Sequence, residues 1–183
     1  TETGFSILVL TNDNEYTTYN CRYAIFATGG IGRVYEYTTN SAIATGDGIT
    51  IAHELGAEIK NLSYIQFHPT GFNNKHTRET FLISESVRGE GAYLKNCNGE
   101  RFMQNYDDRL ELAPRDVVSH AIMAEAKKTG SDKFYLDITH KDPEFVRNRF
   151  PMINEKLLEA GYDMTKDMIP IFPCHHYLMG GIN

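Results

Sequence analysis

The sequence has no tryptophan, only three cysteines among 183 residues and no block of basic residues. Cys21, Cys97 and Cys174 lie far apart and form no C-x-x-C pair, which favours free thiols in a reducing compartment over a disulfide framework. The formal net charge is -6, so a nucleic-acid-binding surface, which is usually rich in Lys and Arg, is not expected. No apolar run approaches the roughly 18 residues that a membrane-spanning helix requires. We therefore expect a soluble, cytoplasmic protein.

Two further absences limit the possible chemistry. The sequence has no G-x-S-x-G motif, so a serine hydrolase has no support. The histidines lack H-x-x-x-H spacing and no cysteine clusters with them, so no metal site is predicted. Nothing in the sequence marks Cys97 or Cys174 as an activated thiol.

Length and composition indicate an ordinary folded chain. A compact chain of 183 residues buries roughly 70% of its unfolded surface and needs no covalent staples. Hydrophobic residues make up 41% of the sequence, which is typical of globular and not of disordered proteins. Residues 1–4 contain neither Met nor a signal peptide, so the chain is expected to begin at an internal boundary of a longer protein.

Hydrophobic periodicity predicts a mixture of strands and helices. Residues 5–10 read as a strand that 16–19 pairs with, and the apolar run 23–27 reads as a buried strand entering a tight loop. A helix follows residue 48 and ends near Gly56, and 57–78 are expected to be irregular. The later expected elements are a helix over 80–88, a hairpin of 92–95 with 101–103, a helix from Pro114 to Gly130, a strand at 134–138, a helix capped by Asp142 and ended by Pro151, another ending at Gly161, and an extended connector at 169–173.

The stretch Leu82–Gly91 carries the most informative pattern. On a helix, Glu85 and Arg88 lie three residues apart on one face, close enough to share hydrogen bonds, and apolar residues interleave with them. The sequence also contains Arg115 after Ala113-Pro114, His68 before Pro69, and the pair His175-His176. Two arginines, a glutamate and two or three histidines suit a small dianionic substrate.

Each of these residues also has an ordinary structural interpretation. Glu85 and Arg88 could form an exposed helix ion pair worth only about 0.3–0.5 kcal/mol. Arg115 could simply occupy the first turn of a helix, and His68 alone would more often be a structural hydrogen-bonding residue. Thr28-Gly29-Gly30 and Thr45–Gly48 could cradle a nucleotide cofactor through backbone N–H groups, but most such loops are only turns, and Asp47 could be a helix cap.

Taken together and in order, these phrases resemble the flavoproteins of the succinate dehydrogenase and fumarate reductase family, and above all its L-aspartate oxidase branch. The resemblance covers essentially the whole chain. It rests on six motifs: Ala27–Gly30, Tyr37–Asn40 with the run to Gly48, Gln66–Thr70, Glu85–Gly91, Leu112–Asp116 and His176–Gly181. The stretch 134–141, with Arg149-Phe150-Pro151, is more similar to the oxidases. The family's G-x-G-x-x-G fingerprint is missing, and Ser84 stands where the family usually has Thr.

The resemblance implies a role for each site residue. It implies Arg115 as the catalytic arginine, with Glu85 and Arg88 as its proton-relay partners. The substrate carboxylates would be bound by His68, Ser84 and His176. The residues expected along the flavin are Thr28, Gly29, Gly30, Asn40 and Asp47.

It also implies a fold and domain layout. The fold class expected is α+β: residues 1–60 would be an incomplete part of an FAD-binding α/β domain, 61–170 a capping domain that covers the substrate, and 171–183 a return to the FAD-binding domain. FAD would be the cofactor of the full-length protein, and this chain alone is expected not to retain it.

The activity implied is FAD-dependent oxidation of L-aspartate to iminoaspartate, which feeds quinolinate and NAD biosynthesis. The substrate would be a C4 dicarboxylate (aspartate, fumarate or succinate), and quinolinate synthase is a possible pathway partner. No membrane partner is expected for an oxidase. Two alternatives stay open: a succinate dehydrogenase or fumarate reductase flavoprotein, and a non-catalytic capping module without flavin.

Overall fold

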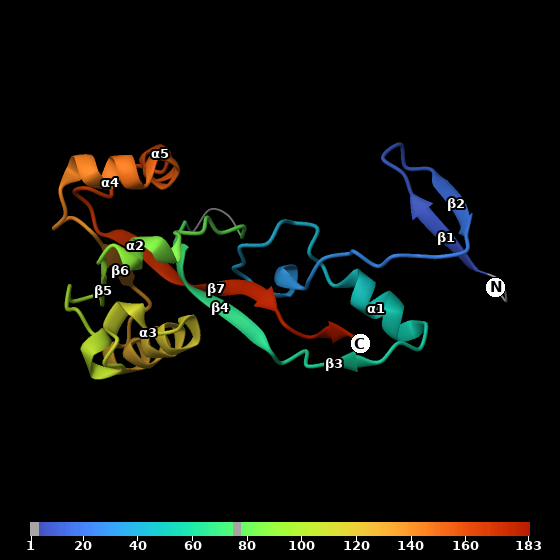
Figure 1. Ribbon diagram of the computed structural model, residues 1–183, viewed down its shortest axis with the longest axis horizontal. Helices are drawn as coiled ribbons and strands as arrows, with labels where there is room; N and C mark the ends of the chain where they lie inside the picture. Colours follow the sequence, from blue (N-terminus) through green and yellow to red (C-terminus); the bar gives the residue numbers. More distant parts are fainter. Residues whose placement is uncertain (1–3, 75–77) are drawn as a thin grey trace.

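A four-stranded antiparallel sheet organises most of the computed structural model, which describes residues 4–74 and 78–183. Its strand order is β4 (Ile65–Phe72), β7 (Ile169–Leu178), β6 (Phe134–Asp137) and β5 (Tyr93–Lys95). β4 and β7 are the long strands, and they run through the middle of the molecule (Figure 1). The mixed helix and strand content agrees with the predicted fold class.

Helices pack around this sheet and form one hydrophobic core. Helix α3 (Arg115–Thr129) packs on β4, while α4 (Pro143–Arg149) and α5 (Pro151–Glu159) follow β6 in the chain. The core residues Ile83, Val87, Leu94, Val118 and Leu157 are all fully buried. The core therefore joins α2 (Glu85–Gly89), β5, α3 and α5, and so fixes the elements that carry the predicted site arginines.

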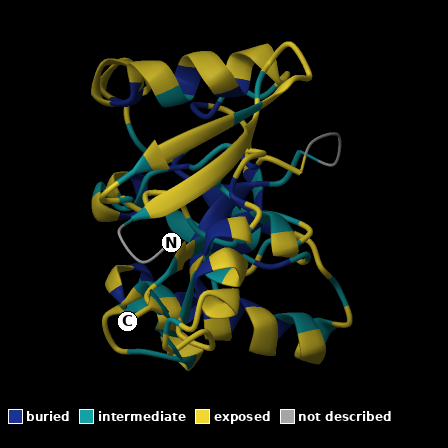
Figure 2. Cartoon of the chain, turned by 90° about the vertical axis from the view of Figure 1, so that its right-hand side faces the viewer, coloured by how far each residue is buried: buried dark blue, intermediate teal, exposed yellow. Residues whose placement is uncertain are grey.

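A second region lies at the other end of the two long strands. Helix α1 (Asp47–Glu54) lies there with β3 (Ile59–Lys60), which pairs with β8 (Gly181–Ile182), and the short helix η1 (Gly32–Val34) precedes them. The hairpin of β1 (Phe5–Leu10) and β2 (Tyr16–Cys21) projects beyond α1 (Figure 1). Its strands are largely exposed on both faces (Figure 2), although β1 is apolar.

Several predicted elements are confirmed. The β1–β2 hairpin, α1, α3 and β6 form where the periodicity predicts them. Asp142 caps α4, because its Oδ1 accepts a hydrogen bond of 2.8 Å from the backbone N–H of Phe145. Gly130 ends α3 in the left-handed conformation with φ 66°.

The predicted buried strand at 23–27 is wrong. These residues have no regular secondary structure, and Tyr23 and Ile25 are 87% and 93% exposed. Within the described part of the chain no strand pairs with this run and no layer covers it. Its apolar sequence alone therefore does not create a strand.

The irregular stretch predicted for 57–78 is also wrong, because it contains β3 and the eight-residue strand β4; its residues 75–77 lie outside the described part of the chain. Pro69 and Gly71 are residue types that weaken a strand prediction, so the sequence does not indicate β4. A proline lacks the N–H that a central strand needs, but β4 is an edge strand, and its register with β7 shifts between His68 and Gly71.

The helix predicted over 80–88 is confirmed only at its end, since α2 covers Glu85–Gly89. The residues before it pair across the sheet: the N–H of Ile83 donates to the carbonyl of Thr70 over 3.1 Å, and Leu82 bridges to Gly71. Tertiary pairing thus overrides local helical preference here.

Two further elements differ from prediction. The hairpin arm at 101–103 is reduced to a single bridge between Lys95 and Arg101, with a short helix η2 (Met103–Asn105) after it. The connector at 169–173 is part of β7, a central strand that crosses the predicted domain boundary at residue 170. Among the described helices, none is long and apolar enough to cross a membrane.

Candidate active site

Glu85 and Arg88 occupy the single turn of helix α2, as their spacing predicts. Ser84 is the N-cap, and its Oγ accepts hydrogen bonds from the backbone N–H of Ser86 over 3.3 Å and from the Ser86 hydroxyl over 2.9 Å. One oxygen of Glu85 lies 3.5 Å from Nη2 of Arg88. Ser84 therefore sits beside the ionic pair, but its hydroxyl already serves the helix start.

Arg115 joins this pair from a different element. It is the first residue of α3, and its Nε donates to Glu85 Oε2 over 2.7 Å. Its Nη1 donates to Oε1 of Gln66 on β4 over 3.0 Å. Glu85 thus lies between two guanidinium groups, while Nη2 of Arg115 has no hydrogen-bond partner among the residues that the structure describes.

Arg88 is the buried member of this group, with no exposed side-chain surface. Its Nη1 donates to the backbone carbonyl of Glu111. Burial lowers the pKa of Arg88, and the carboxylate of Glu85 opposes that effect while the charge of Arg115 adds to it. An exposed helix ion pair, the ordinary alternative for Glu85 and Arg88, therefore does not describe this contact.

His68 approaches the arginines from the middle of β4. It is 1% exposed, and its Nδ1 accepts a hydrogen bond of 3.3 Å from the backbone N–H of Thr70. Burial lowers the pKa of His68 to about 3, and the charges of Arg115, His176 and Arg88 contribute. The ring is therefore neutral near pH 7 and carries its proton on Nε2.

His176 faces His68 from the neighbouring strand β7. The centroids of the two rings lie 5.3 Å apart at an interplanar angle of 65°. Nδ1 of His176 lies 2.6 Å from the hydroxyl of Thr39, and its carbonyl accepts a hydrogen bond of 2.9 Å from the Asn40 amide. Burial and the charge of Arg115 lower its pKa.

A cavity of about 580 Å³ opens beside His176. Its lining includes Thr28, Gly29, Gly30, Asn40 and His176. A Cβ added at Gly29 or Gly30 would meet no atom within 4 Å, so each would project into open space. The cavity therefore adjoins the five charged and imidazole groups through His176.

Comparison with known proteins identifies the family. Residues 3–183 match the sequence profile of the family described as FAD binding domain. The chain belongs to this FAD-binding domain family. FAD is the cofactor of the family.

Relatives of known name place the chain within the family more closely. It is 51% identical to the L-aspartate oxidase of Yersinia pestis over 90% of this chain and 31% of that protein. It is 50% identical to the L-aspartate oxidase of Clostridium perfringens over 93% of this chain and 38% of that protein. The chain spans about a third of the length of the curated relatives that it matches.

Solved structures of the family share the fold. A mutant form of the quinol fumarate reductase of E. coli matches with a TM-score of 0.82 and 35% identity over 92% of this chain and 31% of that one. Sdh1 of Mycobacterium smegmatis matches with a TM-score of 0.76 and 37% identity over 92% of this chain and 29% of that one. The chain thus has the fold of the succinate dehydrogenase and fumarate reductase flavoproteins.

The residues around the cavity suit the family's cofactor. Glycines at positions 29 and 30 leave room that a side chain would fill, which lets a flat ligand approach the backbone. Gly180 and Gly181 also line the cavity, and a Cβ on Gly180 would collide with the backbone of Asn61. Thr28–Gly30, Asn40 and His176 are the residues that could hold part of FAD here.

Asp47 is the one predicted flavin residue outside the lining of this cavity. It is exposed at the start of α1, and Thr45 Oγ1 donates to its Oδ2 over 2.9 Å. It is the first residue of α1, but the N-cap is Gly46 and no side chain caps the helix, so the alternative of Asp47 as a helix cap is wrong.

Sequence reasoning missed the polar residues that orient the site. Gln66 holds Arg115, Thr70 fixes the tautomer of His68, and Thr39 contacts His176. Gln66 and His68 are two residues apart and so share one face of β4, a period-2 signal that an extended interpretation of 65–72 would have carried.

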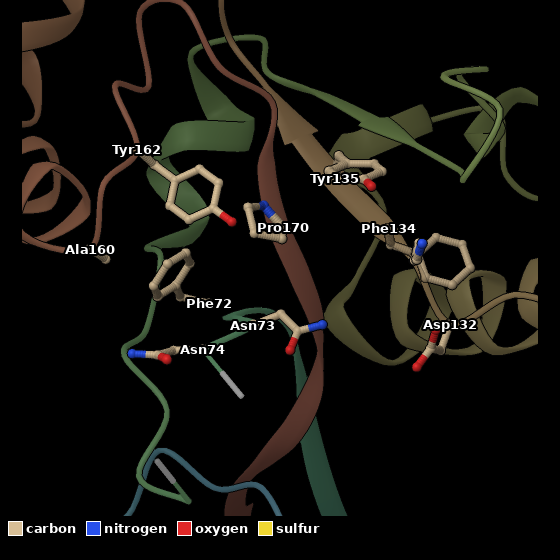
Figure 3. Close-up of a pocket in the computed structure, with 10 residues that line it drawn as sticks. Phe72, Asn73, Asn74, Asp132, Phe134, Tyr135, Ala160, Tyr162 and Pro170 are labelled. Carbon is tan, nitrogen blue, oxygen red and sulfur yellow. The ribbon is translucent and has the colours of Figure 1, made fainter. Parts of the chain in front are cut away.

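A different cavity of about 520 Å³ lies at the Phe72 end of β4 (Figure 3). Phe72, Tyr162, Tyr135 and Pro170 line it, and none of the predicted site residues does. The rings of Phe72 and Tyr162 pack edge to face at 5.6 Å. It is separate from the site described above.

Proposed function

We propose that the full-length protein is an FAD-dependent oxidoreductase that oxidises L-aspartate to iminoaspartate. The observation that carries the proposal is the convergence of Arg115, Glu85, Arg88, His68 and His176 beside a glycine-lined cavity suited to a flavin. The named relatives support aspartate as the substrate.

The charges of the site suit a dicarboxylate. Arg115 keeps Nη2 for a substrate carboxylate, because Nε and Nη1 are engaged by Glu85 and Gln66. His68 is neutral, so it would contribute a hydrogen bond from Nε2 and no positive charge. The substrate would be held at both ends and fixed against the cofactor.

FAD, when bound, supplies the two-electron acceptor for the hydride that leaves the substrate Cα. During aspartate oxidation, Arg115 would bind a substrate carboxylate with its positive charge and fix the orientation of the substrate. Removing a proton from a free arginine at pH 7 costs roughly 8 kcal/mol, so an arginine is a poor general base. In the reduction of fumarate to succinate, which is a different reaction, Arg115 could give a proton to a carbon of fumarate, and Glu85 with Arg88 could replace it.

A second candidate is a succinate dehydrogenase or fumarate reductase flavoprotein. The ordered contacts from Arg115 through Glu85 to Arg88 suit delivery of a proton to carbon, and the fold match to a fumarate reductase supports this candidate. The two candidates share one site and differ in the substrate.

We further propose that residues 61–170 form a capping domain that covers the substrate. We also propose that the full-length protein is a cytoplasmic enzyme that supplies iminoaspartate for quinolinate and NAD synthesis. The isolated chain is proposed to hold no flavin, because its sequence lacks the G-x-G-x-x-G fingerprint that binds a dinucleotide. A stoichiometric flavin absorbance in the purified chain would contradict this.

The deciding experiment uses the full-length protein with FAD bound. Initial rates of aspartate and succinate oxidation are measured with oxygen or an artificial electron acceptor. The initial rate of fumarate reduction is measured with a reduced dye as the electron donor. Turnover of aspartate with little turnover of succinate supports the oxidase. Faster turnover of succinate supports the second candidate, and no turnover of any of the three rejects both.

A further inference from the structure

Glu111 is a buried carboxylate that the proposed mechanism does not use. It lies in the short helix η3 (Leu110–Leu112) and is 4% exposed. Arg101 donates to it from Nε over 2.9 Å and from Nη2 over 2.6 Å, and the backbone N–H of Leu94 donates to it over 3.1 Å. A bidentate guanidinium pair fixes the geometry of a carboxylate more firmly than a single contact does.

The backbone of Glu111 holds Arg88. Its carbonyl accepts the hydrogen bond from Arg88 Nη1, and within the described chain Nε and Nη2 of Arg88 make no hydrogen bond. The position of the Arg88 guanidinium relative to Glu85 therefore depends on this carbonyl. The negative charge of Glu111 also raises the pKa of Arg88 against the effect of burial.

Glu111 also lies four residues before Arg115. Leu110, directly before Glu111, has a left-handed φ of 54°, and the N–H of the fully buried Ala113 donates to its carbonyl over 3.1 Å, so the turn closes around Glu111. Pro114 precedes α3 without any side-chain cap. The start of α3, and hence Arg115, is therefore placed by the turn that Glu111 anchors.

Arg101 is the outer member of this pair. About 35% of its side chain is exposed, and its guanidinium carbon lies 4.3 Å from the ring centroid of Tyr93. We propose that Glu111, clamped by Arg101, is a positioning residue that sets the two arginines on either side of Glu85. The inference rests on the proposed function, because its effect on turnover requires that Arg115 and Glu85 act on the substrate.

The test uses the full-length, FAD-loaded protein and fumarate reduction by a reduced dye. In Glu111→Gln we expect kcat to fall about 10- to 100-fold, because a displacement near 1 Å can have that effect, with KM changed by less than about twofold. Arg101→Lys keeps the positive charge and loses the bidentate guanidinium, so we expect kcat to fall about 3- to 10-fold. Arg109→Gln is the matched control, since Arg109 lies in the same segment and pairs with Asp107.

The pH profile separates positioning from general damage. The charged or titratable groups that face Arg88 are Glu85, Arg115, Glu111 and the neutral His68. Loss of the Glu111 charge leaves Arg88 with one carboxylate fewer, so the alkaline limb of kcat moves to lower pH in Glu111→Gln. It stays in place in Arg101→Lys and Arg109→Gln.

Wild-type kcat and pH profile in both Glu111→Gln and Arg101→Lys would overturn the inference. If Glu111→Gln does not fold, Arg101→Lys, at a partly exposed position, carries the same comparison of kcat with KM. If the wild type turns over no dicarboxylate, the proposed function fails, and a crystal structure of the variant decides the inference. Displacement of Arg88 and Arg115 from Glu85 supports it, and unchanged positions overturn it.

Discussion

Arg115 and Glu85 are 30 residues apart in the sequence, yet Nε of the first lies 2.7 Å from Oε2 of the second. The contact links the start of α3 to the single turn of α2. Because Arg88 meets the other oxygen of Glu85 at 3.5 Å, one carboxylate neutralises part of two positive charges. Each member of this trio should therefore affect turnover in a different way.

Arg115→Leu removes the cation that faces the substrate. We expect kcat for aspartate oxidation to fall about 10³-fold, the upper range for loss of one electrostatic contact at a reacting centre. The FAD absorbance per protein should stay at the wild-type level, because Arg115 does not line the glycine cavity. Stopped-flow reduction of the flavin by aspartate measures the effect, and near-normal reduction would remove Arg115 from the mechanism.

Glu85→Gln keeps the shape of the side chain and removes its charge. Fumarate reduction needs a proton delivered to carbon, so we expect it to fall about 10²-fold, within the range for general acid catalysis. Aspartate oxidation, in which hydride leaves, should fall less. The ratio of the two rates in one preparation is the readout, and equal losses would argue against a relay role.

His68 should stay neutral throughout the mildly acidic range. Its pKa is lowered to about 3 in the folded protein from an ordinary 6.5, so below pH 6.5 the unfolded chain binds a proton that the folded one does not. Stability is therefore lost as pH falls from 6.5 toward 3, by at most about 1.4 kcal/mol per pH unit from this group. His68→Asn should unfold with a weaker dependence on pH over that interval.

Nuclear magnetic resonance of labelled histidine gives an independent measurement. The His68 ring should show the neutral Nε2–H tautomer at pH 5, since Thr70 donates to Nδ1. A ring that titrates near pH 6.5 would contradict the burial described here.

Gly30→Ala tests the cofactor cavity. The new methyl group meets no protein atom within 4 Å, so the fold should tolerate it, but it projects into the space assigned to the flavin. We expect FAD affinity of the full-length protein to fall about 10-fold, or 1.4 kcal/mol. Gly89→Ala adds the same group in open space away from the cavity and should bind FAD normally.

Asp142→Ala tests the fold away from the site. It removes the side-chain bond to the N–H of Phe145 at the start of α4. The cost should be about 1 kcal/mol of unfolding free energy, the usual value of an N-cap. Thermal unfolding measures it, and turnover at low temperature should not change.

Local signals predicted the helices well and the sheet poorly. Short-range features of the sequence mark these helices. Asp142 caps the start of α4, and Gly130 ends α3, as their residue types predict. β4 was missed because Pro69 and Gly71 resemble loop residues until β7 supplies the pairing. The exposed run at 23–27 failed for the converse reason, since its apolar residues have no partner within the described chain.

The candidate site was more predictable than the strands that carry it. Glu85 and Arg88 share one turn, and their spacing brings them together without any tertiary information. Arg115, His68 and His176 come close to this pair only because α3, β4 and β7 pack together. Local sequence patterns do not predict that packing, so the grouping of these residues is predicted only by the family resemblance. Gln66 and Glu111 act through contacts that no local pattern encodes.

The two imidazoles stand on adjacent strands: His68 on β4 pairs with Cys174, and His176 lies on β7 at the register shift between His175 and Tyr177, so the register of the two strands helps to bring the rings together. Side chains alternate between the faces of a strand, so inserting or deleting one residue in either strand would turn its imidazole toward the opposite face. Laboratory evolution of substrate range should therefore accept exchanges of side chain within 65–72 and 169–178 at positions other than Gln66, His68 and His176, while rejecting single-codon insertions and deletions there.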